Sequence, residues 1–394
     1  MNSRQQGFVL VHHYVLSKPK IGVVGGGIGG VATALALHRA GIPAIVYERS
    51  LDLREVGAGM MLWPNATRSL RELGVLQSVI ARGGPSTNFL VRSAGGRVLM
   101  DIALGKFETP AVCMRRCDLL SVLLAALPAN WIRLGHELED IDQARGTVHA
   151  RFKNGATEEF DAAIGADGIR SRVRSELFGE SAPVYRGYTV WRGIARYSGP
   201  ATRLGYNSET WGVGHRFGIL ATGEDRYTWY ATANVPEDHA DAPCGRKQEL
   251  LEMFERWHQP VPQLIEATAD NEILKNPAYD RPALESWGYG SVTLLGDAAH
   301  PCTPNLGQAG CMALEDAVVV AKCVREASTV EAAFRRYESL RQTRTKHIQN
   351  RSRLMGSLGQ WENRPLVAGR EVVTSLLPAA LFERNLRRVY SYEA

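Results

Sequence analysis

The feature that most constrains this chain is a glycine-rich run near its beginning. Within residues 21–37, apolar residues precede and follow the sequence Gly-Gly-Gly-Ile-Gly-Gly. This order predicts a buried strand, a tight turn and a helix. We expect Gly25 to make the turn, Gly27 to let the backbone approach a pyrophosphate, and Gly30 to let the helix pack closely on the strand. The run therefore predicts a phosphate-binding loop.

The residues around this loop favour an adenine dinucleotide as its ligand. A helix that begins near Ile28 offers unpaired N–H groups and a partial positive charge to the phosphates. A second apolar run, residues 44–47, ends at Glu48, at about the distance expected for a carboxylate that binds a ribose 2′-hydroxyl. A solvated carboxylate at a strand end is the alternative for Glu48, and the neighbouring Arg49 can instead meet a 2′-phosphate. FAD or NAD is favoured over NADP.

Composition sets limits on the class of protein. The chain has 394 residues, of which 45% are hydrophobic and 22% charged, which is typical of a globular protein with room for two domains. The net charge of +5 favours anionic ligands such as phosphates but does not indicate nucleic acid. The 6 cysteines lack the spacing of a disulfide framework or of a zinc site. We expect no metal, free thiols and the reducing cytoplasm.

The two ends of the chain are expected to be peripheral. Residues 1–19 read as an N-terminal extension, because His12 and His13 interrupt its apolar stretch and no small-residue cleavage site of a signal peptide follows. No segment approaches the roughly 20 apolar residues that span a bilayer, so we expect no integral membrane segment. Residues 366–381 are apolar enough to pack on the body or to touch a membrane surface.

Two segments between residues 50 and 180 carry further candidate cofactor residues. Gly59 lies in a loop of small residues that permits close backbone approach, and Arg116 begins a predicted helix from which it can reach back to the nucleotide or point into solvent. Farther on, Asp167 and Gly168 lie at the bend of a strand, turn and helix. On its own this would be an ordinary Asp-Gly turn.

A third motif lies some 250 residues after the first glycine loop. Residues 292–317 read as a buried strand, a carboxylate at Asp297, a loop rich in proline and glycine, and a long helix. Open α/β sheets bind ligands beyond the carboxyl ends of their strands, so Asp297 is expected to hold a cofactor hydroxyl. The helix start near Gly307 suits a cofactor that becomes anionic on reduction, as a flavin does.

The composition changes between about Tyr185 and Ala283, where segments rich in Trp, Tyr, Val and Thr predict antiparallel strands. Aromatic residues of this sheet can wall a pocket for a flat apolar ligand or simply pack in a core. Residues 331–355 read as a basic helix. We interpret its arginines as a solvated face rather than a nucleic-acid surface, because few aromatic residues accompany them.

With all three motifs present in this order, the chain resembles the single-component FAD-dependent monooxygenases of the para-hydroxybenzoate hydroxylase type. The likeness is greatest to the branch that contains urate, hydroxynicotinate and alkylquinolone hydroxylases and zeaxanthin epoxidase, and it extends from about Lys20 to the C-terminus. It implies an α/β fold: a Rossmann-like FAD-binding domain with an inserted mixed or antiparallel-sheet substrate domain and a C-terminal helical segment. The implied boundaries are 20–183 with 284–355 for the FAD-binding domain, 80–110 as its contribution to the substrate region, 184–283 for the substrate domain, and 356–394 for the helical tail.

The resemblance also implies roles for individual residues. Glu48 would bind the adenosine ribose, Arg116 would reach the nucleotide portion of FAD, and the backbone near Leu138 would touch the adenine. Asp167 and Gly168 would serve both FAD and the nicotinamide cofactor, and Asp297 would bind the ribityl side. The other implied cofactor contacts are Ile28, Gly59, Pro304, Gly307, Gln308, Ala309, Gly310 and Cys311.

On the substrate side, Arg216 matches a position that faces substrate in some relatives. Met61 stands where some relatives place a histidine base, so no catalytic residue or base is identified, and an electron-rich or apolar substrate is favoured. Met60 and Trp63 are expected to help keep the reaction dry. The other expected substrate-facing residues are Trp191, Tyr227 and Trp229.

The implied reaction uses tightly bound FAD. NAD(P)H, a transient co-substrate, reduces the flavin, O2 then forms a flavin C4a-hydroperoxide, and its distal oxygen hydroxylates a small aromatic or heteroaromatic substrate. Epoxidation of an isoprenoid or polyene double bond is the alternative within the family. An NAD-dependent dehydrogenase and a non-catalytic flavin redox sensor are alternatives from other classes. NADH versus NADPH, and monomer versus homodimer, stay open.

Overall fold

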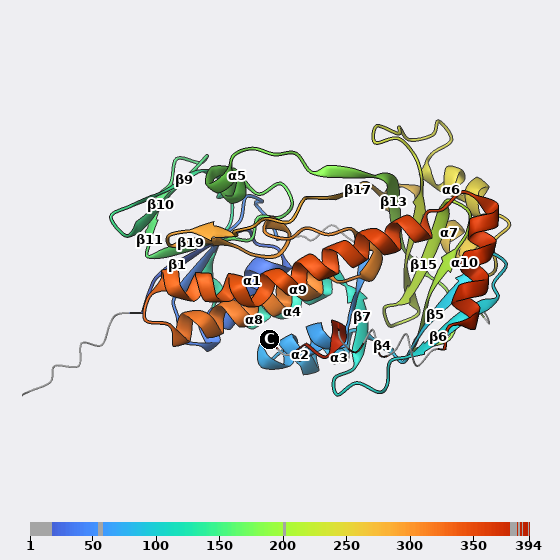
Figure 1. Cartoon of the computed structure of the whole chain (residues 1–394), viewed down its shortest axis with the longest axis horizontal. Coiled ribbons are helices and arrows are strands. Elements are labelled where there is room, and N and C mark those ends of the chain that lie inside the picture. Colours follow the sequence, from blue (N-terminus) through green and yellow to red (C-terminus); the bar gives the residue numbers. More distant parts are fainter. Residues whose placement is uncertain are drawn as a thin grey trace, which may run out of the picture.

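The structure is a computed structural model that describes residues 18–53, 58–199, 202–378, 384, 387, 389–392 and 394. Most of the expected N-terminal extension, part of the loop before Gly59 and the end of the apolar stretch 366–381 lie outside the described residues. The molecule is elongated, with one sheet system near each end and a long helix that runs between them (Figure 1).

A six-stranded sheet carries the glycine-rich loop. Its order is β18-β19-β12-β1-β2-β8, and all neighbours are parallel except the β18–β19 pair. β1, β12 and β19 are buried along their whole length, as expected for parallel strands covered on both faces. The strands are β1 (Ile21–Val24), β2 (Ala44–Tyr47), β8 (Ile132–Arg133), β12 (Ala162–Gly165), β18 (Gly288–Tyr289) and β19 (Val292–Leu294).

Helices cover this sheet and continue its core. α1 packs against α8, which in turn packs against α9 and α2. The helices of this part are α1 (Ile28–Arg39), α2 (Pro64–Glu72), α3 (Leu76–Arg82), α4 (Arg116–Ala125), α5 (Arg172–Phe178) and α8 (Ala309–Glu326). Short 3-10 helices lie between strands and helices: η1 (Ala129–Trp131), η2 (Asp270–Glu272), η3 (Gly296–Ala298) and η4 (Pro304–Leu306).

Two three-stranded antiparallel sheets flank the main sheets. The sheet β11-β10-β9 projects at one end of the molecule, and the sheet β3-β7-β4 lies toward the centre (Figure 1). Their strands are β3 (Gly59–Leu62), β4 (Gly84–Ser86), β7 (Ala111–Arg115), β9 (Leu138–Ala144), β10 (Thr147–Phe152) and β11 (Thr157–Phe160).

A seven-stranded sheet forms the other half of the molecule. Its order is β17-β13-β16-β15-β14-β5-β6, antiparallel except for the parallel pair β14–β5. The strands are β5 (Asn88–Ser93), β6 (Val98–Ala103), β13 (Val184–Arg196), β14 (Tyr206–Trp211), β15 (His215–Ala221), β16 (Arg226–Ala233) and β17 (Leu274–Asp280). One face buries a second hydrophobic core beneath α6 (Arg246–Phe254) and α7 (Val261–Glu266).

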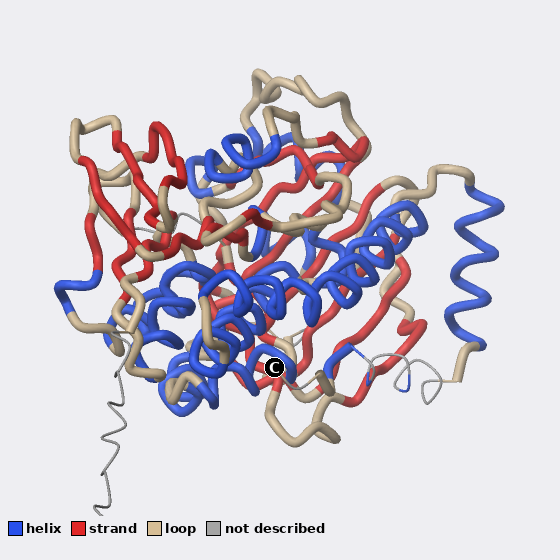
Figure 2. Tube along the Cα trace, turned by 60° about the vertical axis from the view of Figure 1, so that its left-hand side comes forward, coloured by secondary structure: helices blue, strands red, loops and turns tan. Residues whose placement is uncertain are grey.

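Two C-terminal helices connect and border these halves. α9 (Val330–Gly359) starts beside the six-stranded sheet and ends beside the seven-stranded one, and α10 (Arg364–Leu376) stands at the far end, next to β6 (Figures 1 and 2). Among the described residues, no helix combines the length and apolarity needed to cross a bilayer.

The predicted fold class is confirmed, and the interpretation of the basic helix as a solvated face is wrong for Arg341 and Arg353. The α/β architecture, the predominantly antiparallel second sheet and the C-terminal helices are present, while the domain boundaries stay a prediction. The basic helix, α9, is not simply a solvated face. Arg341 is fully buried, where it forms ion pairs with Glu315 and Asp316. Arg353 forms an ion pair with the buried Asp280. These arginines face inward because they neutralise buried carboxylates that lie far from them in the sequence.

Candidate active site

The glycine loop has the geometry that phosphate binding requires. Gly25 has φ +111°, and a Cβ there would lie 2.4 Å from the carbonyl oxygen of Ala166. A Cβ on Gly30 would lie 1.9 Å from the carbonyl oxygen of Gly25, so α1 can pack this close to the loop only through glycine. A Cβ on Gly27 would meet open space instead. Gly27 therefore presents bare backbone to a ligand at the start of α1.

Glu48 lies directly beside this loop. Its Oε2 accepts a 2.6 Å hydrogen bond from the N–H of Gly26, and its Oε1 accepts one of 2.9 Å from the N–H of Ser50. The carboxylate is thereby fixed at the end of β2, next to the turn. Arg49 points elsewhere: it is exposed, and its charge helps to lower the pKa of Glu137 after the larger effect of Lys153.

The third motif reaches the same edge of the sheet from the other side. Because β19 and β1 both run parallel to β12, which lies between them, their carboxyl ends meet. A Cβ on Gly29 would lie 3.1 Å from Leu295 and 3.3 Å from Ala313, so the two loops and α8 are in close contact. Asp297 lies in η3 and its side chain is accessible to solvent. Desolvation by the surrounding protein nevertheless raises the pKa of its carboxyl group, and this effect outweighs the charges of His300 and Arg116, which lower the pKa.

The Asp-Gly bend supports this arrangement structurally. Gly168 has φ +82°, and Asp167 Oδ2 accepts bonds from the N–H groups of Arg172 and Val173 at the start of α5. Arg174, in the first turn of that helix, donates to the carbonyl of Ala298 in η3 at 3.1 Å. The second and third motifs are thus connected directly.

A buried ionic network lies behind the third motif. Asp316 on α8 accepts from the N–H of Gly296, from His300 Nε2 at 2.6 Å and from Arg341 Nε at 2.6 Å. Burial alone would raise the pKa of Asp316, but His300 and Arg341 outweigh it and lower the pKa to about 2. The network fixes the backbone of Gly296, and with it the loop that carries Asp297.

A cavity of about 1060 Å³ joins these loops to the seven-stranded sheet. One end is lined by Gly26, Gly27 and Glu48, the middle by Gly307 and Gly310 at the start of α8, and the rest by the sheet and α10. The αL conformation of Gly307 (φ +60°) ends η4 and directs the chain into α8. One continuous space therefore connects the predicted nucleotide site with a predominantly apolar chamber.

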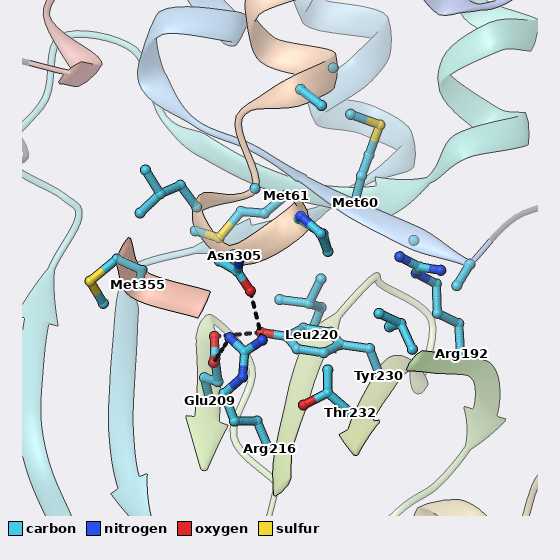
Figure 3. A pocket seen from close by; sticks show the side chains of 18 of the residues that line it. Met60, Met61, Arg192, Glu209, Arg216, Leu220, Tyr230, Thr232, Asn305 and Met355 are labelled. Carbon is cyan, nitrogen blue, oxygen red and sulfur yellow. Dashed lines mark hydrogen bonds and ion pairs between the residues drawn. The ribbon is translucent and has the colours of Figure 1, made fainter. Parts of the chain in front are cut away.

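A polar cluster rises from the sheet into this chamber (Figure 3). Arg216 on β15 donates to Glu209 Oε1 at 3.0 Å and to Asn305 Oδ1 at 2.6 Å, and Tyr230 donates to Glu209 Oε2 at 2.7 Å. Gln360, at the end of α9, accepts from Arg216 Nε at 2.9 Å. Arg216 and Glu209 form a buried ion pair. Burial alone would lower the pKa of Arg216, but the charge of Glu209 outweighs it and raises the pKa.

A second arginine faces the other end of the chamber. Arg192 on β13 lines the cavity, and its Nη1 donates a hydrogen bond of 3.4 Å to Asn276 Oδ1. Burial, and then the charge of Arg116, lower its pKa to about 10. Arg116, which begins α4, lines the same cavity. Two cations therefore lie within electrostatic range of each other between the nucleotide end and the chamber.

The cavity brings together many of the residues predicted from sequence. Those that line it are Gly27, Glu48, Gly59, Met60, Met61, Trp63, Arg116, Pro304, Gly307, Ala309, Gly310 and Arg216. Those that do not line it are Gly25, Ile28, Gly30, Arg49, Leu138, Asp167, Gly168, Asp297, Gln308 and Cys311. Cys311 is buried, which raises the pKa of its thiol to about 12 and excludes a thiolate there.

The expectation that Trp191, Tyr227 and Trp229 face the substrate is wrong. All three are buried in the second core, on the sheet face covered by α6 and α7. Successive residues of a strand point to opposite faces, and these three have the parity of Phe217 rather than that of Arg216. Trp229 stacks on Phe217 with ring centroids 5.5 Å apart and donates to Thr268 at 2.8 Å.

The sequence-based prediction missed Arg192, Glu209, Tyr230 and Asn305. Arg192 and Tyr230 directly follow two of the tryptophans just described, so strand alternation alone could have found them. Glu209 had no such signal, because its pairing with Arg216 depends on the register between β14 and β15, in which Trp211 is opposite Arg216.

Comparison with known proteins identifies the family. Residues 18–353 match the family model described as FAD binding domain. The chain belongs to this FAD-binding family. Aurachin C monooxygenase/isomerase of Stigmatella aurantiaca is 38% identical over 93% of the chain and 96% of that protein. Zeaxanthin epoxidase of Solanum lycopersicum is 36% identical over 86% of the chain, which matches 54% of that longer protein.

A solved structure shows the same fold. HpxO of Klebsiella pneumoniae, complexed with FAD and uric acid, superposes with a TM-score of 0.89 at 24% identity over 94% of the chain and 96% of its own. The family member described here is an FAD-dependent monooxygenase, and the alternative of an NAD-dependent dehydrogenase is excluded.

The described residues fit FAD. Open space in front of Gly27, the fixed carboxylate of Glu48 and the adjoining N-terminus of α8 suit the pyrophosphate, the ribose and an anionic reduced ring respectively. Trp63 Nε1 is buried without a hydrogen-bond partner and lies at the cavity wall, 3.1 Å from where a Cβ on Gly307 would be. The individual contacts stay predictions.

Proposed function

We propose that this monooxygenase inserts one oxygen atom into the ring of an uncharged aromatic or heteroaromatic substrate, held above Arg216 and Glu209. The observation that carries this proposal is the ionic pairing of these two residues at the wall of a mainly apolar cavity. Because Arg216 already faces a carboxylate, the cluster offers hydrogen bonds without a net charge.

The charge balance argues against a carboxylated ring as substrate at this cluster. An anion placed against Arg216 would lie close to the carboxylate of Glu209 as well, and the two negative charges would repel in a site of low dielectric constant. A polar substituent of a neutral ring can instead donate a hydrogen bond to the hydroxyl of Thr232, which lines the cavity and gives its own proton to Gln360. The cluster thus orients a ring by hydrogen bonds.

The rest of the chamber keeps the reacting position dry. When bound, FAD reduced by NAD(P)H supplies activated oxygen. Met60 and Met61 approach from β3, opposite Leu220 on the sheet (Figure 3), and such side chains exclude water. A Cβ on Gly310 would lie 2.6 Å from Met60 Cε, so this methionine lies directly against the start of α8. Met61 offers no proton acceptor, which favours a ring that is already electron-rich.

Epoxidation of an isoprenoid double bond is the second candidate. It is supported by the similarity to zeaxanthin epoxidase and by the apolar lining of the cavity. Both reactions transfer one oxygen atom to an electron-rich carbon, so the same chamber serves either. The outcome depends on which group the substrate places beside the flavin.

A substrate panel tests the proposal. Phenols, quinolones, purines and isoprenoids are each added to the FAD-loaded enzyme, and NAD(P)H consumption and product mass are recorded. A neutral ring compound that stimulates consumption and gains one oxygen supports hydroxylation, whereas an oxygenated isoprenoid alone supports epoxidation. If no ring compound stimulates consumption and none gains oxygen, the proposed substrate class fails. Running the panel with NADH and NADPH separately identifies the electron donor.

We further propose a reducing compartment such as the cytoplasm as the place of action. All 6 cysteines are free thiols, although Cys244 is exposed. Whether the enzyme works as a monomer or a homodimer stays a prediction, which sedimentation of the FAD-loaded protein decides.

A further inference from the structure

One wall of the cavity comes from residues that follow α10 in the sequence. Residues 389–392, which we call the strap, lie beside α2 and not beside α10 (Figure 1). Tyr390 of the strap is 3% exposed and lines the cavity. Its ring stacks on that of Trp63 with centroids 4.5 Å apart, and it meets the ring of Phe107 in a T-shaped contact at 5.8 Å. The strap is therefore part of the cavity wall and not a peripheral tail.

This wall adjoins the start of α8. The edge of Trp63 that carries Nε1 lies 3.1 Å from where a Cβ on Gly307 would be. Burial, and then the nearby thiol of Cys311, raise the pKa of Tyr390 well above its usual value of 10, so the phenol stays neutral. Gly307 precedes α8, and Cys311 lies in its first turn. The stacked pair thus borders the part of the cavity that suits the flavin ring.

Two arginines hold the strap by its backbone. Arg344 on α9 donates to the carbonyl of Val389 at 2.7 Å. Arg68 on α2 donates to the carbonyl of Tyr392, also at 2.7 Å. The guanidinium of Arg344 lies over the ring of Tyr392 as well, 4.2 Å from its centre. Because the strap is bound on either side of Tyr390, α2 and α9 together fix the position of that side chain.

The anchor of the strap shares a carboxylate with the start of α8. Arg344 forms a bidentate pair with the buried Glu315 of α8 at 2.6 and 2.8 Å. The side-chain amide of Asn65 donates to Glu315 at 2.6 Å and to Gln308 Oε1, directly before α8, at 3.0 Å. One buried network therefore connects the strap with the loop that enters α8 at the flavin end of the cavity.

We propose that Tyr390 is a positioning residue for oxygenation, which holds Trp63 against the start of α8 and thereby keeps water from the flavin end of the cavity. A ring that covers the face of a second ring leaves less space for water than a smaller side chain does. Where water enters, NAD(P)H, O2 and a proton yield only NAD(P)⁺ and hydrogen peroxide, and no oxygen atom reaches the substrate. Since this wall adjoins the cofactor end, the proposal applies to a ring and to an isoprenoid substrate alike.

The test uses the FAD-loaded enzyme and a readout that needs no substrate. Quenching of the bound flavin's fluorescence by acrylamide reports how readily small molecules reach the flavin. Tyr390→Ala should raise the quenching constant severalfold, whereas Tyr390→Phe, which keeps the stacked ring, should match the wild type. Tyr289→Ala removes a 73% exposed ring on β18 and is the control that should change nothing. With any compound that the enzyme oxygenates, the peroxide formed per NAD(P)H consumed should rise in Tyr390→Ala alone.

Tyr390→Leu keeps the proposal testable if the alanine variant fails to fold. Leucine leaves an apolar side chain in the buried position but cannot stack on Trp63, so quenching should still exceed that of the wild type. A folded leucine variant with wild-type quenching and peroxide yield overturns the proposal, as does equal quenching in Tyr390→Phe and Tyr390→Ala. If quenching changes as expected while no ring compound is oxygenated, this proposal stands and the proposed substrate class fails.

Discussion

The two faces of the seven-stranded sheet have the same backbone but opposite chemistry. On the face beneath α6 and α7, Trp191, Phe217 and Trp229 pack into a closed core. The other face lines the cavity with Arg192, Arg216 and Tyr230. Each of these residues is the direct neighbour in sequence of one of the three core aromatic residues. The aromatic residues that dominate the sequence of this region thus stabilise the sheet, while the less conspicuous polar residues between them face the ligand.

This contrast separates two kinds of burial. Trp229 and Tyr230 are neighbours in β16, and the ring of the first is enclosed by protein. Tyr230 is only partly buried by its neighbours and places its hydroxyl on Glu209 at the cavity wall. Substitutions at neighbouring positions should therefore affect different properties, stability on one face and ligand recognition on the other.

The largest expected effect is on the core face. Trp229→Ala removes a fully buried ring that stacks on Phe217, so we expect the free energy of unfolding to fall by about 3–5 kcal/mol. Chemical denaturation measures this loss. In the fraction that stays folded, the ratio of product formed to NAD(P)H consumed should match that of the wild type. If the variant has normal stability but releases peroxide instead of product, Trp229 lines the cavity and does not belong to the core.

The fold was predictable to the extent that it depends on local patterns. The order of apolar runs and glycines around Gly25 and Asp297 predicted two strands, each followed by a loop that binds a cofactor. The structure brings their carboxyl ends together because both strands lie in one parallel sheet. The pairing of Arg341 with Glu315 and Asp316 was not predictable, since no local pattern indicates that a basic helix will pack on acidic positions of the preceding helix.

The candidate site was predictable where it depends on backbone and not where it depends on register. Gly27 and Gly307 stand out in sequence because a loop that approaches a ligand needs glycine. Glu209 and Arg216 become partners only when β14 pairs with β15, and a shift of one residue would direct one of them into the core. For the same reason the tryptophans were assigned to the wrong face.

The next largest effect should come from the charge on the cavity face. Glu209→Gln keeps the shape of the side chain but leaves the charge of Arg216 without its carboxylate. We expect preference to shift toward ring compounds that bear a carboxylate, by about 2 kcal/mol or roughly 30-fold in relative Kd. Titrating a matched neutral and carboxylated pair into wild type and variant measures this shift. Unchanged relative affinities would mean that ligands do not sense the Arg216 charge.

A smaller effect is expected from Tyr230→Phe, which removes one hydroxyl from the cavity face and leaves the ring. The lost hydrogen bond to Glu209 should weaken ring binding or reduce stability by about 1 kcal/mol, a factor of roughly five. Comparing the unfolding midpoint and the Kd of this variant with those of Trp229→Ala tests the contrast between neighbours directly. A loss of stability as large as that of Trp229→Ala would show that the two faces are equally structural.

The smallest expected effect is one of pH, and its sign follows from the position of Tyr230. Burial, and then the Glu209 carboxylate, raise the pKa of Tyr230 well above its usual value of 10. The folded protein therefore keeps the phenol neutral, and the stability this contributes is complete below pH 10 and is lost as the pH rises above it, where only the unfolded chain ionises. The difference in unfolding free energy between wild type and Tyr230→Phe should accordingly be constant from pH 7 to about pH 10 and shift against the wild type above that. If the difference in unfolding free energy instead changes with pH near neutrality, the phenol of Tyr230 ionises within the cavity. In that case the polar cluster, rather than Met61, supplies the proton acceptor.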